Sequence, residues 1–140
     1  MTAKQFLRQV EFIDTHIESL IEEKEELEAR KTAVKSSLPS GMPKGGTHDT
    51  TDTLIALMEK IDTLERRVND EIARSCQVKL RVMDVIDMVD DARYRTLLEL
   101  RYLRGCTWET IAQKMNYEVR WVYELHGQAL PVVQKLMEMQ

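Results

Sequence analysis

The chain has few of the residues that interrupt helices. Its 140 residues include only five glycines and three prolines, and four of the glycines lie between positions 41 and 105. Glu, Lys, Leu, Arg and Met, which favour helices, are abundant by contrast. This composition argues against a fold rich in strands and turns, and it predicts an all-α protein.

Long apolar runs and paired cysteines are also missing. No run of 18 apolar residues occurs, so we expect no membrane-spanning helix and no membrane partner. The N-terminal sequence "MTAKQFLRQVEF" lacks the apolar core of a signal peptide. Cys76 and Cys106 have neither CxxC spacing nor paired histidines, which indicates free thiols in a reducing cytosol rather than a structural disulfide. We therefore expect a cytoplasmic protein.

Motifs of catalysis are absent from the chain as well. It contains no phosphate-binding loop, no G-x-S-x-G and no Cys–His pair with catalytic spacing. His16, His48 and His126 are far apart and fall in different kinds of segment, so no metal site is predicted. We expect no enzyme, no cofactor and no small-molecule substrate.

Charge is unevenly distributed along the chain. Residues 1–90 hold 18 acidic and 13 basic residues, a net charge of −5, whereas residues 91–140 hold 6 acidic and 7 basic residues, a net charge of +1. The acidic part is not expected to bind nucleic acid broadly, and the C-terminal part is only faintly basic for a DNA-binding domain.

Two long helices are predicted within residues 1–90. The first covers 2–35, and Thr2 and Gln5 fit a capping box at its start. Its apolar stripe alternates steps of four and three: Phe6, Val10, Ile13, Ile17, Leu20, Lys24, Leu27, Lys31 and Val34. This spacing is a heptad seam that contains two lysines. The segment of residues 36–50, "SSLPSGMPKGGTHDT", contains two prolines and three glycines, which predicts a mobile loop.

The second predicted helix covers residues 51–89. Its expected seam is Leu54, Leu57, Ile61, Leu64, Val68, Glu71, Ser75, Val78, Val82, Val85 and Val89, with Ile72 as a substitute where the seam weakens. Neither long helix is stable alone, so each needs a partner for its apolar face. An antiparallel, coiled-coil-like hairpin within the chain is the simplest arrangement. Pairing with a second copy, including a dimeric four-helix bundle, is the alternative.

Three shorter helices are predicted within residues 91–140. Asp90 or Asp91 caps the first, "ARYRTLLELRYLRG", which ends at Gly105. Thr107 caps the second, which reaches about Met115. Asn116 and Tyr117 form a turn, and the third helix begins near Glu118 with an inward stripe of Val122, Leu125, Ala129, Val133 and Leu136. Three helices with a tight final turn are typical of a helix-turn-helix unit.

The segment "YRTLLELRYLRGCTWETIAQKMNYEVRWVYELHGQALPVV" resembles the fourth region of bacterial primary sigma factors. It is also similar to the phage-borne, sigma-factor-like transcription regulators of the ArpU and RinA type, and the resemblance to an uncharacterised phage family extends over essentially the whole chain. The resemblance implies a three-helix, sigma-like helix-turn-helix domain at 91–140 that follows the helical hairpin at 1–90. It implies double-stranded DNA as a partner, and RNA polymerase as a further one.

The resemblance also implies which residues contact DNA. They are Thr107, near a phosphate, and Val119, Arg120, Trp121, Tyr123, Glu124 and Gln128 on the third helix. Val119, Trp121, Tyr123 and Gln128 stand where sigma factors often carry arginine, so the charge of this surface is reduced. Arg120 can read guanine and Glu124 can accept from cytosine. Packing of Trp121 and Tyr123 against a partner protein or a second protomer is the alternative.

Pro131 follows the predicted contact helix. It cannot donate a hydrogen bond to the carbonyl of Gly127, so we expect the helix to kink or stop at Leu130. The following "PVVQKLMEMQ" predicts a short continuing helix with more apolar surface than a free tail needs. It either packs back on the same unit or forms a dimer contact.

These observations lead to three hypotheses. The first is a phage or prophage transcription regulator that binds promoter DNA as a homodimer and does not itself open the duplex, since residues 1–90 are acidic and carry only two aromatic residues. The second is an oligomeric assembly or DNA-packaging protein. The third is an adaptor whose third helix binds protein instead of DNA.

Overall fold

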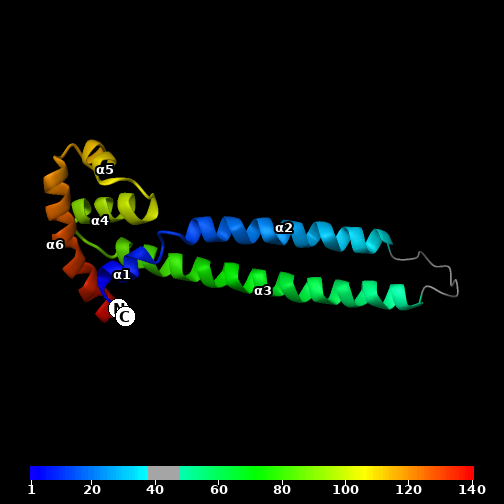
Figure 1. Cartoon of the computed structure of the whole chain (residues 1–140). Coiled ribbons are helices and arrows are strands. Elements are labelled where there is room, and N and C mark those ends of the chain that lie inside the picture. Colours follow the sequence, from blue (N-terminus) through cyan, green and yellow to red (C-terminus); the bar gives the residue numbers. More distant parts are fainter. Residues whose placement is uncertain (38–47) are drawn as a thin grey trace. The chain divides into compact units, whose positions relative to one another are not determined.

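A computed structural model describes residues 1–37 and 48–140, and all regular elements in these residues are helical (Figure 1). The expected all-α class is confirmed for this part of the chain. In chain order the elements are α1 (Ala3–Arg8), α2 (Ile13–Ser37), α3 (His48–Asp87), α4 (Ala92–Leu98), the π-helix η1 (Glu99–Leu103), α5 (Trp108–Met115) and α6 (Val119–Glu138). Of the predicted loop at 36–50, residues 38–47 lie outside the described residues, and its two ends are helical.

Contacts divide the chain into two compact units. Residues 15–74 form one unit, and residues 1–14 together with 75–140 form the other. These units do not follow the expected division into 1–90 and 91–140. The reason is that α1 and the last turns of α3 bury their apolar side chains in the same core as α4, α5 and α6. Helix α3 is continuous across the boundary between the units.

In the unit of residues 15–74, α2 and α3 lie side by side and run in opposite directions (Figure 1). The residues buried between them are Leu20, Leu27 and Val34 from α2 and Ile61 and Val68 from α3. Every position of the stripe expected on the first helix is buried or half-buried. The two lysines of that stripe stay half-buried, and Nζ of Lys31 lies 2.6 Å from Oδ1 of Asp62. The hydrogen bond to Asp62 raises the pKa of Lys31 and lowers that of Asp62.

The seam of α3 differs in part from the expected one. Met58 packs against the buried cluster, while Leu57 is 43% exposed. Ile72 likewise packs against that cluster, as the sequence allowed. Leu64, an expected member of the seam, also packs against the cluster. Buried and half-buried residues at steps of four and three are Leu54, Met58, Ile61, Glu65, Val68, Ile72 and Ser75, and we call these the observed seam. Leu57 and Met58 are adjacent apolar residues, so the pattern alone did not decide which of them faces α2.

The first predicted helix is broken near its start. Helix α1 ends at Arg8, and residues 9–12 form turns closed by i to i+3 hydrogen bonds, such as the one from the Glu11 amide to the Arg8 carbonyl (3.0 Å). The expected capping box is present, since Thr2 accepts from the Gln5 amide and the Gln5 side chain accepts from the Thr2 amide. A single helix over 2–35 was therefore wrong. The apolar spacing runs across the break, but its residues belong to two cores. Phe6 and Val10 are buried in one, and Leu20, Leu27 and Val34 are buried in the other.

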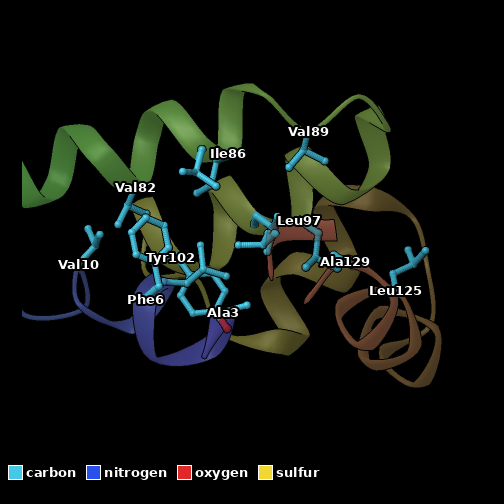
Figure 2. Packing of buried hydrophobic residues seen from close by; sticks show 14 of the residues in the cluster. Ala3, Phe6, Val10, Val82, Ile86, Val89, Leu97, Tyr102, Leu125 and Ala129 are labelled. Carbon is cyan, nitrogen blue, oxygen red and sulfur yellow. The ribbon is translucent and has the colours of Figure 1, made fainter. Parts of the chain in front are cut away.

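The core of the other unit brings together residues from both ends of the chain (Figure 2). Its fully buried members include Leu7 of α1, Ile86 of α3, Leu97 of α4, Ile111 of α5 and Leu125 of α6. Figure 2 shows Phe6 and Ala3 of α1 beside Tyr102, Val82 and Ile86. The two chain ends are joined by a hydrogen bond from the Ala3 amide to Oε1 of Gln134 (2.8 Å).

Helix α6 continues through Pro131 without interruption and reaches Glu138. Of the two expected outcomes at Leu130, a kink or a stop, the stop was wrong. Val133 is fully buried, and Leu136 and Met137 pack against the same core. This burial holds the helical turns on both sides of the proline in place, at the cost of the hydrogen bond that Pro131 cannot donate. Of the two alternatives for the C-terminal segment, packing within its own unit is the one observed.

Candidate nucleic-acid interface

The candidate interface is built from α5, the turn after it and the start of α6. Thr107 caps α5, and its hydroxyl oxygen accepts from the Thr110 amide (3.2 Å). Asn116 ends α5 in the left-handed conformation, with φ 59°, and its amide donates to Ala112 and Gln113 carbonyls. Glu118 is the N-cap of α6, although its side chain makes no capping hydrogen bond. The caps and the turn lie where the sequence predicted them, because each depends on residues close together in the chain.

One side of α6 is packed and the opposite side is open. Val122, Leu125, Ala129 and Val133 are fully buried, as the helical spacing predicted. Of the predicted DNA-contacting residues on this helix, four are exposed: Arg120, Tyr123, Glu124 and Gln128. The open side therefore begins in the first turn of α6, at Arg120.

The other two predicted residues on α6 are partly withdrawn from solvent. Val119 and Trp121 are half-buried and pack against the core of their unit. Tyr123 is 49% exposed, and its ring lies 5.2 Å from that of Trp108, centroid to centroid, at an angle of 52°. This contact connects the first residue of α5 to the open side of α6, so Thr107 also lies near that side.

Two of the predicted contact residues already have hydrogen-bond partners. The Thr107 hydroxyl donates to Oγ1 of Thr110 (2.9 Å) in addition to capping α5. Oε1 of Gln128 accepts from the hydroxyl of Tyr94 (3.0 Å), which leaves the amide nitrogen of Gln128 free to donate. In the described part of the chain, by contrast, no carboxylate lies within 4 Å of the Arg120 guanidinium. Arg120 is therefore the best-placed cation on the open side of α6.

A cluster of aromatic and basic side chains supports α5 and α6, and our sequence analysis did not single it out. The Tyr102 hydroxyl lies 2.7 Å from Nε2 of His126, and both residues are buried. The Trp108 ring meets the His126 ring edge to face, with centroids 4.8 Å apart. The Arg101 guanidinium lies 4.3 Å from the Trp108 ring centroid, and one of its nitrogens donates to the Cys106 carbonyl (3.0 Å).

The sequence did contain a signal for the buried histidine. His126 lies four residues after Val122 and three before Ala129, which places it on the inward side of α6. Burial, together with the nearby cations Lys4 and Arg101, lowers the pKa of His126 from 6.5 to about 4. Burial also raises the pKa of Tyr102. His126 is therefore neutral at pH 7, and the Tyr102 hydroxyl can donate to its unprotonated Nε2.

The remaining features concern metals, thiols and membranes. Among the described residues, no group of three or more His, Cys, Asp or Glu side chains is arranged to hold a metal ion. Cys76 and Cys106 are both free thiols, as the sequence predicted. Within the same residues, no helix combines the length and the apolar character needed to cross a membrane.

Comparisons with protein-family models, with curated proteins and with solved structures find no match to this chain.

Proposed function

We propose that the protein is a phage or prophage transcription regulator that binds promoter DNA through a sigma-like helix-turn-helix, as a homodimer. In this proposal, α5 and α6 form the helix-turn-helix, α4 with η1 is the supporting third helix, and α6 enters the major groove. The observation that carries the proposal is the open side of α6, which begins just after a tight left-handed turn and presents Arg120, Glu124 and Gln128.

These three side chains offer a pattern of donors and acceptors that suits base edges. Arg120 can donate two hydrogen bonds to O6 and N7 of guanine, and Glu124 can accept from N4 of cytosine. Gln128 keeps its amide donors free, because only its oxygen is used by Tyr94. Lys114 is exposed at the end of α5 and adds a cation for the phosphate backbone.

The low net charge of residues 91–140 supports DNA binding by a dimer instead of a monomer. Residues 91–140 carry a net charge of only +1, and binding through phosphate contacts depends on basic residues. Two copies on one operator would double the number of contacts. Ile21, Ile55 and Leu57 remain exposed on α2 and α3, and such side chains support self-association of the long helices.

Selection of bound sites from random duplex DNA, at two salt concentrations, tests the proposal. We expect one enriched sequence and an affinity that falls steeply as salt rises. Arg120→Ala should weaken binding to that sequence by about 1–3 kcal/mol and relax the preference at one base pair. Arg67→Ala, which removes an exposed arginine of α3, is the matched control and should bind as the unaltered protein does.

Three outcomes would contradict parts of the proposal. If no sequence is enriched and the salt dependence is flat, the protein is not a DNA-binding regulator. If a sequence is enriched but Arg120→Ala binds it normally, α6 is not the reading helix. If sedimentation shows a closed oligomer larger than a dimer, a role in assembly or DNA packaging is favoured instead.

A protein-binding adaptor is the second candidate function. The observation that favours it is the aromatic surface made by Trp108 and the 49% exposed Tyr123, since aromatic side chains are enriched in protein interfaces. Under this alternative, Tyr123→Ala abolishes partner binding whereas Arg120→Ala leaves it unchanged.

A further inference from the structure

A pocket of about 520 Å³ lies beside η1, and four of its lining side chains are basic. It adjoins the proposed DNA interface at one residue, Trp108, whose ring also contacts Tyr123. Its cations are Lys4 and Arg8 of α1, Arg101 of η1 and Arg104 just after η1. The lining also contains two acids, Glu11 and Asp14, and the ring of Trp108. All of them belong to the unit made of residues 1–14 and 75–140. The volume falls within the range of small-molecule sites, roughly 300–1,000 Å³.

The two acids of the pocket are paired with cations, whereas three of its cations have no carboxylate partner among the described residues. Glu11 pairs with Arg8 at 3.4 Å, and Asp14 pairs with Nζ of Lys79, which lies outside the lining, at 2.6 Å. Within the described part of the chain, no carboxylate lies within 4 Å of the side-chain nitrogens of Lys4, Arg101 or Arg104. The four cations and two acids of the lining leave a net charge of +2 in the pocket.

One of these cations is held in a fixed orientation. The Arg101 guanidinium lies 4.3 Å from the Trp108 ring centroid and donates one hydrogen bond to the Cys106 carbonyl. An arginine has five N–H donors, so most of those on Arg101 remain available. A guanidinium held in place loses less conformational freedom when it binds an anion than a free one does.

The backbone around Arg101 is unusual, and this is independent of the charges. Residues Glu99–Leu103 form a π-helix, in which the Arg104 amide donates to the Glu99 carbonyl (3.0 Å). The chain leaves it through Gly105 at φ 69°, and the Cys106 amide donates to the Leu100 carbonyl (2.9 Å). π-Helical turns are rare and occur frequently at functional sites. Here the wide turn and its exit carry five consecutive lining residues, 101–105.

We propose that this pocket binds a small molecule that carries a phosphate monoester, with Lys4, Arg101 and Arg104 around the phosphate. A monoester carries a charge of roughly −1.5 to −2 at pH 7, which matches the +2 of the pocket. A carboxylate or an internal DNA phosphodiester carries only one negative charge and leaves part of the positive charge unbalanced. The proposal goes beyond the DNA-binding function and does not depend on it, and it departs from our expectation of no small-molecule substrate.

Calorimetric titration of the full chain with glycerol 3-phosphate, AMP and inorganic phosphate tests the proposal. We expect saturable binding of all three with one site per chain. Lys4→Gln and Arg104→Gln should each weaken that binding by about three- to tenfold, as expected for the loss of one partly exposed charge-assisted contact. Lys60→Gln, which removes an exposed cation of the other unit, should leave the affinity unchanged.

A pH series tests whether the pocket prefers a doubly charged phosphate to a singly charged one. The second pKa of a phosphate monoester is about 6, so lowering the pH from 7.5 to 5.5 should weaken binding by about fourfold as the dianion is lost. Acetate and a methyl phosphodiester, which carry one charge at both pH values, should bind weakly and without this change. If they bind as tightly as glycerol 3-phosphate, the monoester assignment is wrong.

Competition with duplex DNA separates the two possible sources of phosphate. A 20-base-pair duplex without terminal phosphates should leave glycerol 3-phosphate bound. Full displacement would show that the pocket belongs to the DNA-backbone contacts, and it would overturn the proposal of a small ligand. Absence of heat with all three phosphate probes, or equal weakening by Lys60→Gln, would also overturn it. Each of these results can be obtained whether or not the protein selects a DNA sequence.

Discussion

The hydroxyl of Tyr102 lies 2.7 Å from Nε2 of His126, in the core that joins η1 to α6. Both residues are buried, and the Trp108 ring lies against the histidine from the side of α5. Tyr102, His126 and Trp108 therefore connect η1, α6 and α5, which are three of the helices in the proposed DNA-binding unit. The Tyr102–His126 pair also makes the stability of this unit depend on the protonation of one imidazole.

We expect the unit to lose stability as the pH falls from about 6.5 towards 4. The pKa of His126 is about 4 in the folded chain, below its ordinary value of 6.5, so the unfolded chain binds a proton in this range and the folded chain does not. The stability is fully present above pH 6.5. Since solvent screens part of the effect, we expect a loss of about 1–2 kcal/mol between pH 7 and pH 4.5. Urea unfolding at a series of pH values measures it.

His126→Gln is the variant that isolates this contribution. Glutamine keeps an acceptor for the Tyr102 hydroxyl but does not titrate. The unaltered protein and the variant should therefore differ in the slope of stability against pH between 6.5 and 4, and agree in slope above pH 7. Equal slopes throughout would contradict the assignment of the effect to His126.

Asn116→Ala should destabilise the turn between α5 and α6 by about 1 kcal/mol. Asn116 has φ 59°, a conformation in which a Cβ without a local polar contact is strained. Asn116→Gly, which adopts this conformation freely, should be neutral within about 0.5 kcal/mol. Gln113→Ala, at an exposed position inside α5, is the control for a loss of side-chain contacts. Thermal unfolding checks all three, and an alanine variant as stable as the glycine variant would contradict the argument.

Pro131→Ala should stabilise the protein by about 1–3 kcal/mol. Proline inside a helix lacks the amide that would donate to the carbonyl of Gly127, and its ring crowds the preceding turn. Alanine restores the donor and removes the crowding, while the exposed position of residue 131 means that little packing is lost. Lys135→Ala, on an exposed position of the same helix, should change the unfolding temperature little. No gain from Pro131→Ala would show that the helix is distorted there for another reason.

Glu65→Leu should stabilise the unit of residues 15–74 by about 1–2 kcal/mol. Glu65 occupies the observed seam of α3, and its Oε1 is buried without a hydrogen-bond partner. Leucine removes this unsatisfied atom and adds apolar surface beside Ile61 and Val68, and Lys31 keeps its pairing with Asp62. Urea unfolding compares it with Glu22→Leu at an exposed position of α2. A similar effect of the two substitutions would contradict the packing argument.

The sequence predicted the local features of the candidate site well. Thr107 caps α5 and Asn116 forms the turn, as expected, because such features depend on residues within a few positions of each other. Helix α6 also begins next to Glu118, where its start was expected. The exposed side of α6 follows from the 3.6-residue period of its apolar stripe. What the pattern did not predict is that Val119 and Trp121 are half-buried, since that depends on how wide the contact with the other helices is.

The sequence by itself determined that the protein is helical and which side of each helix is apolar. These properties come from a scarcity of glycine and proline and from spacings of three and four residues, which act within one helix. The tertiary structure alone decided that the first helix breaks after Arg8 and that α6 continues through Pro131. It also decided that residues 99–103 form a π-helix beside Lys4. Each of these outcomes depends on the burial of side chains that are distant in sequence, and the free energy of that burial outweighs local preference.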